Sequence, residues 1–148
     1  MKIDATKMAD DIVHWNINGL KSKQSINYNT KIEKIKSILD NKNTLLINIQ
    51  ETHLFSENEI PQYLHYYKHI FHFENSFANK NDPSSGILLG IRKSEDIIET
   101  KTIEEGRLIY IKLKNKASSE ITNLFSIYCK AGNAEKQKKI DLKIGKRN

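Results

Sequence analysis

The chain has 148 residues, of which 38% are hydrophobic and 28% are charged, and its formal net charge is +6. This length predicts one domain with a real core, and no apolar run approaches the roughly 20 residues of a membrane span. The N-terminal MKIDATKMADD has no apolar segment, so we expect no secretory signal. The single cysteine, Cys129, excludes an internal disulfide and fits a reducing, intracellular compartment.

The positive charge is concentrated at the C-terminal end. Residues 130–148 hold six lysines and Arg147 against Glu135 and Asp141, which leaves the preceding residues nearly neutral. A basic tail attracts phosphate backbones through counterion release. A solvated, frayed helix end has the same composition, so charge alone leaves both interpretations open.

The first half of the chain predicts a strand, a helix and a second strand. Residues 11–17 place Val13, Trp15 and Ile17 on one face of a strand that Gly19 ends. Residues 30–40 have helical apolar spacing, and Thr30 and Glu33 have the spacing of a capping box. Residues 44–50 are apolar without alternation, which is typical of a strand covered on both faces.

The second half predicts mostly strands. Pro61 weakens a short helix expected within residues 57–67. Composition predicts a loop at 78–86 and a hairpin connection at 115–119. The expected strands are 68–74, 86–92, 107–114 and 120–128, followed by a loop and a lysine-rich helix. The whole order predicts one α/β unit.

Polar side chains follow two of the predicted strands. Asn16 and Asn18 are two residues apart and share a face at the end of the first strand, and Glu51 follows the strand 44–50. The intervening helix makes a βαβ-like unit, which would bring the strand ends together. A carboxylate and an amide oxygen suit a hard cation such as Mg²⁺. Spacing alone equally allows turn-capping asparagines and a solvated glutamate.

Several other polar and aromatic residues favour structural roles. His65, His69 and His72 would share a helical face, but the strand-like KHIFHF scatters them. Cys129 has no evident base partner, and Ser84-Ser85-Gly86 lacks the strand–helix context of a nucleophile elbow. Trp15 and the tyrosines favour packing over base stacking; the tyrosines are Tyr63, Tyr66 and Tyr67.

Three motifs carry a resemblance to a known family. HWNINGL, INIQETHL and SIYCKAGN, in this order, resemble the endonuclease/exonuclease/phosphatase superfamily, above all the apurinic-endonuclease-like domain of non-LTR retrotransposon polyproteins. SSGILLGIRKS and GRLIYIKL resemble its middle strands. The resemblance covers about residues 11–140, leaving an N-terminal extension at 1–10 and a basic tail at 141–148. It implies one half of a two-sheet α/β sandwich with flanking helices.

The resemblance also implies roles for individual residues. Glu51 would be the main ligand of Mg²⁺ or Mn²⁺, with Asn16 beside it on the metal or the scissile phosphate. Tyr128 would contact the phosphate. Gln50 would orient its neighbours, Asn18 would make an outer contact, and His53 would face solvent and substrate. The implied chemistry is metal-dependent phosphodiester hydrolysis on DNA.

The sequence departs from the family pattern after Tyr128. The family continues with a small residue, proline and often asparagine, where this chain has Cys129, Lys130 and Ala131. A GDFN-like motif and a closing Ser-Asp-His segment are absent, and neither Glu135 nor Asp141 has the GDFN context. We therefore expect the chain to stop near the middle of a family domain and to supply one sheet. Its uncovered face, with Ile and Phe side chains of GILLGIR and NLFSIY, would promote self-association.

Three functions remain open from sequence. In the first, the chain is the N-terminal half of a magnesium-dependent endonuclease of the retroelement type and is inactive alone. In the second, it is a catalytically dead remnant that binds nucleic acid or a partner protein. In the third, it is a superfamily member that acts on another phosphoester. No membrane role is expected. The expected location is intracellular, and nuclear if the chain comes from a eukaryotic mobile element.

Overall fold

The computed structural model describes residues 9–20 and 27–129. β1 (Asp11–Asn16), α1 (Tyr28–Asp40) and β2 (Thr44–Gln50) form a βαβ unit in which the two strands are parallel. β2 then pairs antiparallel with β4 (Ile87–Arg92), and β4 pairs with β3 (Phe71–Ser76). The resulting four-stranded sheet has the order β1-β2-β4-β3. The parallel unit predicted from sequence is thus confirmed, and its strand ends meet at one edge.

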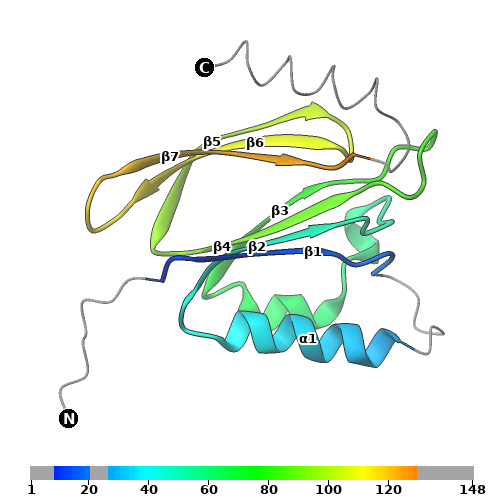
Figure 1. Ribbon diagram of the computed structural model, residues 1–148, viewed down its shortest axis with the longest axis horizontal. Coiled ribbons are helices and arrows are strands. Elements are labelled where there is room, and N and C mark those ends of the chain that lie inside the picture. The colour runs from blue at the N-terminus through cyan, green and yellow to red at the C-terminus, as the bar shows by residue number, and fades with distance from the viewer. Residues whose placement is uncertain (1–8, 21–26, 130–148) are drawn as a thin grey trace.

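A second sheet comes from the same chain. β5 (Glu95–Glu104), β6 (Leu108–Asn115) and β7 (Ile121–Ile127) form an antiparallel meander. Figure 1 shows this three-stranded sheet over one face of the four-stranded sheet, with α1 on the opposite face. The expectation that the chain supplies one sheet is therefore wrong.

The two sheets share a buried apolar core. Its members come from β2 and β4 on one side and from β6 and the end of β7 on the other: Leu46, Ile87, Leu89, Ile91, Ile109, Ile111, Leu113 and Tyr128. Ile87 and Ile91 have no exposed surface, so the predicted uncovered face of GILLGIR is wrong as well. Phe125 is half-buried on β7, with its ring centroid 5.0 Å from that of Tyr110. Apolar surface of the four-stranded sheet is buried where we expected it to be exposed, because the second sheet covers it.

A second core lies between the four-stranded sheet and the helical side. Ile35 and Leu39 of α1 pack there with Ile47 and Ile49 of β2. Side chains alternate along a strand, so Leu46 faces the other sheet while Ile47 faces α1. This arrangement explains why β2 is apolar without alternation, as predicted. Trp15 packs against this core, which confirms its structural role.

The start of α1 corrects a sequence prediction. The helix begins at Tyr28, its N-cap residue is Asn27, and the cap lacks a side-chain hydrogen bond to the helix. Thr30 therefore lies inside the first turn, and the predicted capping box with Glu33 is wrong. The segment 57–67 forms two 3₁₀ helices, η1 (Glu57–Glu59) and η2 (Gln62–Tyr67), separated around Pro61.

Some predictions lie outside the described residues. These include the lysine-rich helix, the basic tail, the boundary at residue 140, and the residues Lys130, Ala131, Glu135 and Asp141. Among the described helices, none has the length and apolarity to cross a membrane.

Candidate active site at the paired strand ends

Asn16 ends β1, and Glu51 directly follows β2 at the same end of the sheet. Asn16 is the register partner of Gln50, so Glu51 is one residue further along β2. The pairing continues beyond the strands, because the Gly19 amide donates to the Glu51 carbonyl at 2.7 Å. The βαβ unit thus places the two predicted metal-side residues on adjacent chain segments, as required for a shared site.

The loop after β1 is held from the helix side. Asn18 is exposed and has a left-handed backbone, with φ of 51°. Lys31 of α1 donates from Nζ to the carbonyl oxygens of Asn18 and Gly19, both at 3.1 Å. This anchoring fixes the backbone around Asn18, while its side chain stays at the surface.

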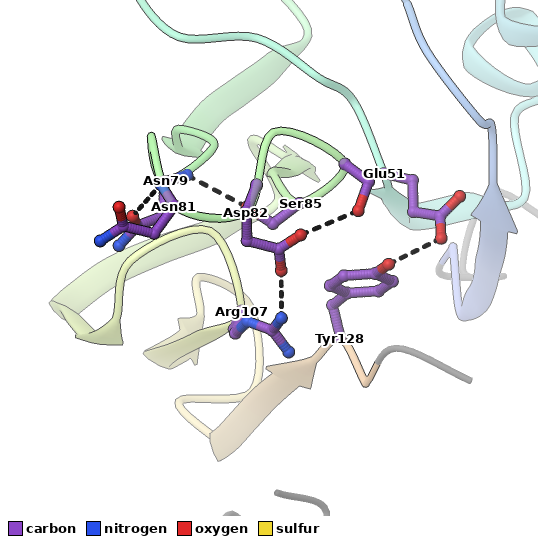
Figure 2. Close-up of polar contacts among 8 residues, drawn as sticks. Glu51, Asn79, Asn81, Asp82, Ser85, Arg107 and Tyr128 are labelled. Carbon is purple, nitrogen blue, oxygen red and sulfur yellow. Dashed lines mark hydrogen bonds and ion pairs between the residues drawn. The ribbon is translucent and has the colours of Figure 1, made fainter. Parts of the chain in front are cut away.

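Glu51 reaches the second sheet. Its Oε1 accepts a 2.7 Å hydrogen bond from the Tyr128 hydroxyl, which comes from the residue after β7 (Figure 2). Glu51 has a φ of 55°, in the left-handed region that is uncommon outside glycine. Normal strand alternation would turn consecutive side chains to opposite faces. The left-handed turn explains how Gln50 and Glu51 both contact the β7 side.

Gln50 is a buried link between the sheets. Its Nε2 donates to the Ile127 carbonyl at 2.7 Å and lies 3.4 Å from the Ser126 hydroxyl. These contacts hold the end of β7 beside the end of β2, and so place Tyr128 against Glu51. That Gln50 orients its neighbours in the site stays a prediction.

Tyr128 is buried in the core with its hydroxyl at the site. Burial, followed by the hydrogen bond to the Glu51 carboxylate, raises the pKa of Tyr128. The phenol is therefore protonated at neutral pH and acts as a hydrogen-bond donor.

His53 lies against the loop after β1. A Cβ on Gly19 would sit 3.1 Å from its Nδ1, and Gly19 itself has a φ of 97°. His53 is half-buried, so the expectation that it faces solvent and substrate stays a prediction for its exposed part.

Three residues beside Tyr128 were missed by sequence analysis. Arg107 and Asp82 form a buried ion pair, and the Ser84 hydroxyl donates to Asp82 Oδ1 at 2.9 Å. The Arg107 guanidinium lies 5.6 Å from the centroid of the Tyr128 ring. DPSSG is a loop, as predicted, but composition gave no sign that its aspartate meets an arginine 25 positions later.

The donor set at the site fits a hard cation only in part. Within residues 9–20 and 27–129, no three His, Cys, Asp or Glu side chains group together as metal ligands. Glu51 supplies one carboxylate, and its Oε1 is already hydrogen-bonded to Tyr128. Mg²⁺ commonly keeps several waters and binds through one or two carboxylates, so Glu51 supplies one ligand of the kind that this cation takes.

Other candidate residues have structural positions. His65 lies in η2 and His72 in β3, so the three histidines do not share a helix face, as expected from the strand-like sequence. Cys129 is half-buried.

Comparisons with known proteins agree with this geometry. No family model matches the chain, and no curated protein matches it. Among solved structures, the catalytic domain of APE2 from Xenopus laevis superposes with a TM-score of 0.52 at 18% identity, over 84% of this chain and 46% of that one. The AP endonuclease LMAP from Leishmania major gives a TM-score of 0.53 at 18% identity, over 79% and 39%.

The chain therefore shares part of the fold of these two AP endonuclease structures, which are of the superfamily type that the motifs resembled. It spans less than half the length of either solved domain. The mixed α/β, sandwich-type fold class that the motif resemblance implied is confirmed, although this chain supplies both sheets and not one. In this fold, the NINGL and QETHL motifs lie side by side at one end of the two-sheet structure, with Tyr128 beside Glu51.

Proposed function

We propose that the chain is the metal-side part of a Mg²⁺- or Mn²⁺-dependent phosphodiesterase that nicks DNA, as retrotransposon-encoded endonucleases do, and that it is inactive alone. The observation that carries this proposal is the 2.7 Å hydrogen bond from Tyr128 to Glu51 at the ends of the paired strands. It joins, across the two sheets, two residues that the motifs had singled out independently. The likeness to two AP endonucleases supports DNA as the substrate class.

The residues of the chain have distinct tasks in this proposal. Glu51 and Asn16 offer oxygen ligands to the cation, and Tyr128 donates a hydrogen bond from a phenol that stays protonated at neutral pH. A bound Mg²⁺ would polarise the phosphate and stabilise the leaving oxygen. Gln50 keeps Tyr128 in place by holding the end of β7. Asn18 lies at the loop surface, in reach of an outer contact with the substrate.

Hydrolysis needs two further groups, an activator of the attacking water and a donor for the transition-state charge. The 148-residue sequence has no GDFN or Ser-Asp-His motif that would supply them. Losing a general base or a transition-state donor costs about 10²–10⁴ in rate for each group. We therefore predict background-level nicking of supercoiled plasmid by this chain with Mg²⁺.

The assay compares the unaltered chain with Glu51→Gln, which keeps the side-chain shape and removes its charge. Equal, background-level nicking by the two proteins agrees with an active site that this chain supplies only in part. Robust nicking that disappears in Glu51→Gln would contradict inactivity and show that a second chain completes the site. Robust nicking that persists in Glu51→Gln would refute the role of Glu51. Downstream GDFN and Ser-Asp-His codons in the same reading frame would identify a fragment of an active enzyme.

The alternative function is a catalytically dead module that binds nucleic acid through its basic tail, or binds a partner protein or a second copy. Residues 130–148 carry a net charge of +5, which favours a polyanion. A chain that binds DNA with a steep salt dependence, but binds no divalent cation through Glu51, would favour this alternative. Action on another phosphoester would show as Glu51-dependent release of phosphate from a non-nucleic substrate. We infer an intracellular location, nuclear if the chain comes from a eukaryotic mobile element.

A further inference from the structure

A buried ion pair lies directly behind the candidate site. Asp82 is 8% exposed and Arg107 is 5% exposed. Removing two charges from water costs several kcal/mol per ion in general, so a buried pair is weak evidence of a purely stabilising role. Arg107 Nη1 is also buried without a hydrogen-bond partner among the described residues. Burying two charges and an unpaired nitrogen lowers stability, so we look for a functional role of this pair.

The pair is connected to Tyr128 through Arg107, and Figure 2 shows Arg107 beside both Asp82 and Tyr128. Ser84 donates to Asp82 Oδ1 at 2.9 Å and so holds the carboxylate that pairs with Arg107. The Arg107 guanidinium lies near the Tyr128 ring, and the Tyr128 amide donates to the Arg107 carbonyl at 2.7 Å. The Tyr128 ring is thus held on the Arg107 side, while its hydroxyl is bonded to Glu51.

The loop that carries Asp82 is itself held by hydrogen bonds. The Ser85 hydroxyl donates to the Asp82 carbonyl at 2.8 Å and accepts from the Asn79 amide at 3.1 Å. The Asp82 amide donates to the Asn79 carbonyl at 2.9 Å. These bonds hold Asp82 in place independently of its contact with Arg107, so Asp82 can act as a rigid support.

We propose that Asp82, Ser84 and Arg107, here called the supporting cluster, are positioning residues that hold Tyr128, and through its hydroxyl the Glu51 carboxylate, in the orientation that binds a divalent cation. This inference rests on the proposed function and names three residues that act through Tyr128. It assigns the cluster no contact with the substrate. Groups that orient metal ligands commonly change metal affinity by about 10–100-fold when they are removed.

The experiment uses the whole chain and Mn²⁺ as the probe. Paramagnetic broadening of NMR signals at Asn16, Glu51 and Tyr128 reports even weak binding at this site. Titrations compare the unaltered chain with Asp82→Asn, Ser84→Ala and Glu51→Gln. Asp96→Asn is the matched control, because it removes one partner of the exposed ion pair with Lys116. The melting temperature of every variant is measured in parallel.

We expect saturable broadening that Glu51→Gln abolishes. Asp82→Asn should weaken Mn²⁺ binding by about 10-fold or more, Ser84→Ala should weaken it less, and Asp96→Asn should leave it unchanged. Ser84→Ala removes only a half-buried hydroxyl, so it decides the question if Asp82→Asn does not fold.

Two outcomes would overturn the inference in distinguishable ways. Lower melting temperatures with unchanged Mn²⁺ affinity in Asp82→Asn and Ser84→Ala would make the cluster merely structural, and leave the proposed function standing. Absence of Glu51-dependent Mn²⁺ binding in the unaltered chain would remove the proposed function and this inference together.

Discussion

At the scale of single residues, the Tyr128 hydroxyl joins the two sheets at the candidate site through Glu51. Tyr128→Phe removes this hydrogen bond and keeps the buried ring. Glu51 is only half-buried and its oxygen can turn to water, so we expect a loss of about 1 kcal/mol in the free energy of unfolding. Urea unfolding measures it.

Tyr110→Phe is the matched control for this prediction. The Tyr110 hydroxyl donates to Asn123 at an exposed position, so its loss should change stability by less than about 0.5 kcal/mol. Equal effects of the two substitutions would mean that the Tyr128–Glu51 bond contributes nothing special.

Gly86 permits the close approach of the segment after β2. It has a φ of 116°, and a Cβ there would lie 2.3 Å from Thr52 Oγ1. Gly86→Ala should cost about 3 kcal/mol or more, because backbone strain and a steric clash act together. Thermal or urea unfolding gives the loss.

A double-mutant cycle separates the two causes at Gly86. Thr52→Ala removes the hydroxyl that would clash, so the double variant should lose less stability than the sum of the single variants. Strict additivity would assign the whole effect to the backbone of residue 86.

The residues that the motifs marked and those they missed differ in one physical respect. Asn16 ends β1 and Glu51 directly follows β2, so their place at a strand end is a local property of the sequence. Asp82 and Arg107 meet only because the loop 77–86 folds onto the turn before β6. No local pattern encodes a contact of that kind.

At the scale of elements, α1 begins earlier than its sequence pattern predicted. Thr30 lies in the first turn, after the N-cap residue Asn27. Thr30→Ala should therefore change the free energy of unfolding by less than about 0.5 kcal/mol, whereas loss of a capping threonine typically costs about 1 kcal/mol.

Lys31→Met provides the comparison for α1. It removes the ammonium that donates to the carbonyls of Asn18 and Gly19, so we expect a loss of about 0.5–1 kcal/mol. A larger loss for Thr30→Ala than for Lys31→Met would restore the capping interpretation. Urea unfolding of both variants measures the two losses in free energy of unfolding.

β5 is the strand that the sequence analysis missed. Its sequence, EDIIETKTIE, places Ile97 and Ile98 side by side, which interrupts strand alternation. The structure has register shifts in the pairing with β6 between Ile97 and Glu99 and between Thr102 and Glu104. Each irregularity changes which side chains face the core, so the period-2 signal disappears although the backbone stays extended.

At the scale of the whole molecule, three tyrosines make the stability of the fold depend on pH in the alkaline range. Burial raises the pKa of Tyr63 and Tyr128, and burial followed by a hydrogen bond to Asp40 raises the pKa of Tyr67 to about 12. The unfolded chain releases these protons near pH 10 and the folded chain releases them later. Stability is therefore full below pH 10 and falls as the pH rises above it.

Urea unfolding across pH 7–12 measures this loss. The Tyr63 hydroxyl is buried without a hydrogen-bond partner among the described residues, so Tyr63→Phe should not lower the free energy of unfolding at pH 7. Above pH 10, the free energy of unfolding should fall less steeply with pH in Tyr63→Phe than in the unaltered chain. An unchanged slope in Tyr63→Phe would show that this phenol ionises as readily in the folded chain as in the unfolded one.

The sequence by itself determined the local features of this protein. Apolar runs fixed most strands, helical spacing fixed the body of α1, and the NINGL and QETHL motifs marked a βαβ unit with polar residues at its strand ends. Tertiary structure alone decided how the two sheets share the core around Ile87 and Ile91, and which side Glu51 faces. The second sheet buries a face that looks exposed from sequence, and a left-handed backbone at Glu51 turns its carboxylate to Tyr128. Both depend on contacts between segments far apart in the chain, and such contacts leave no periodic signal in the sequence.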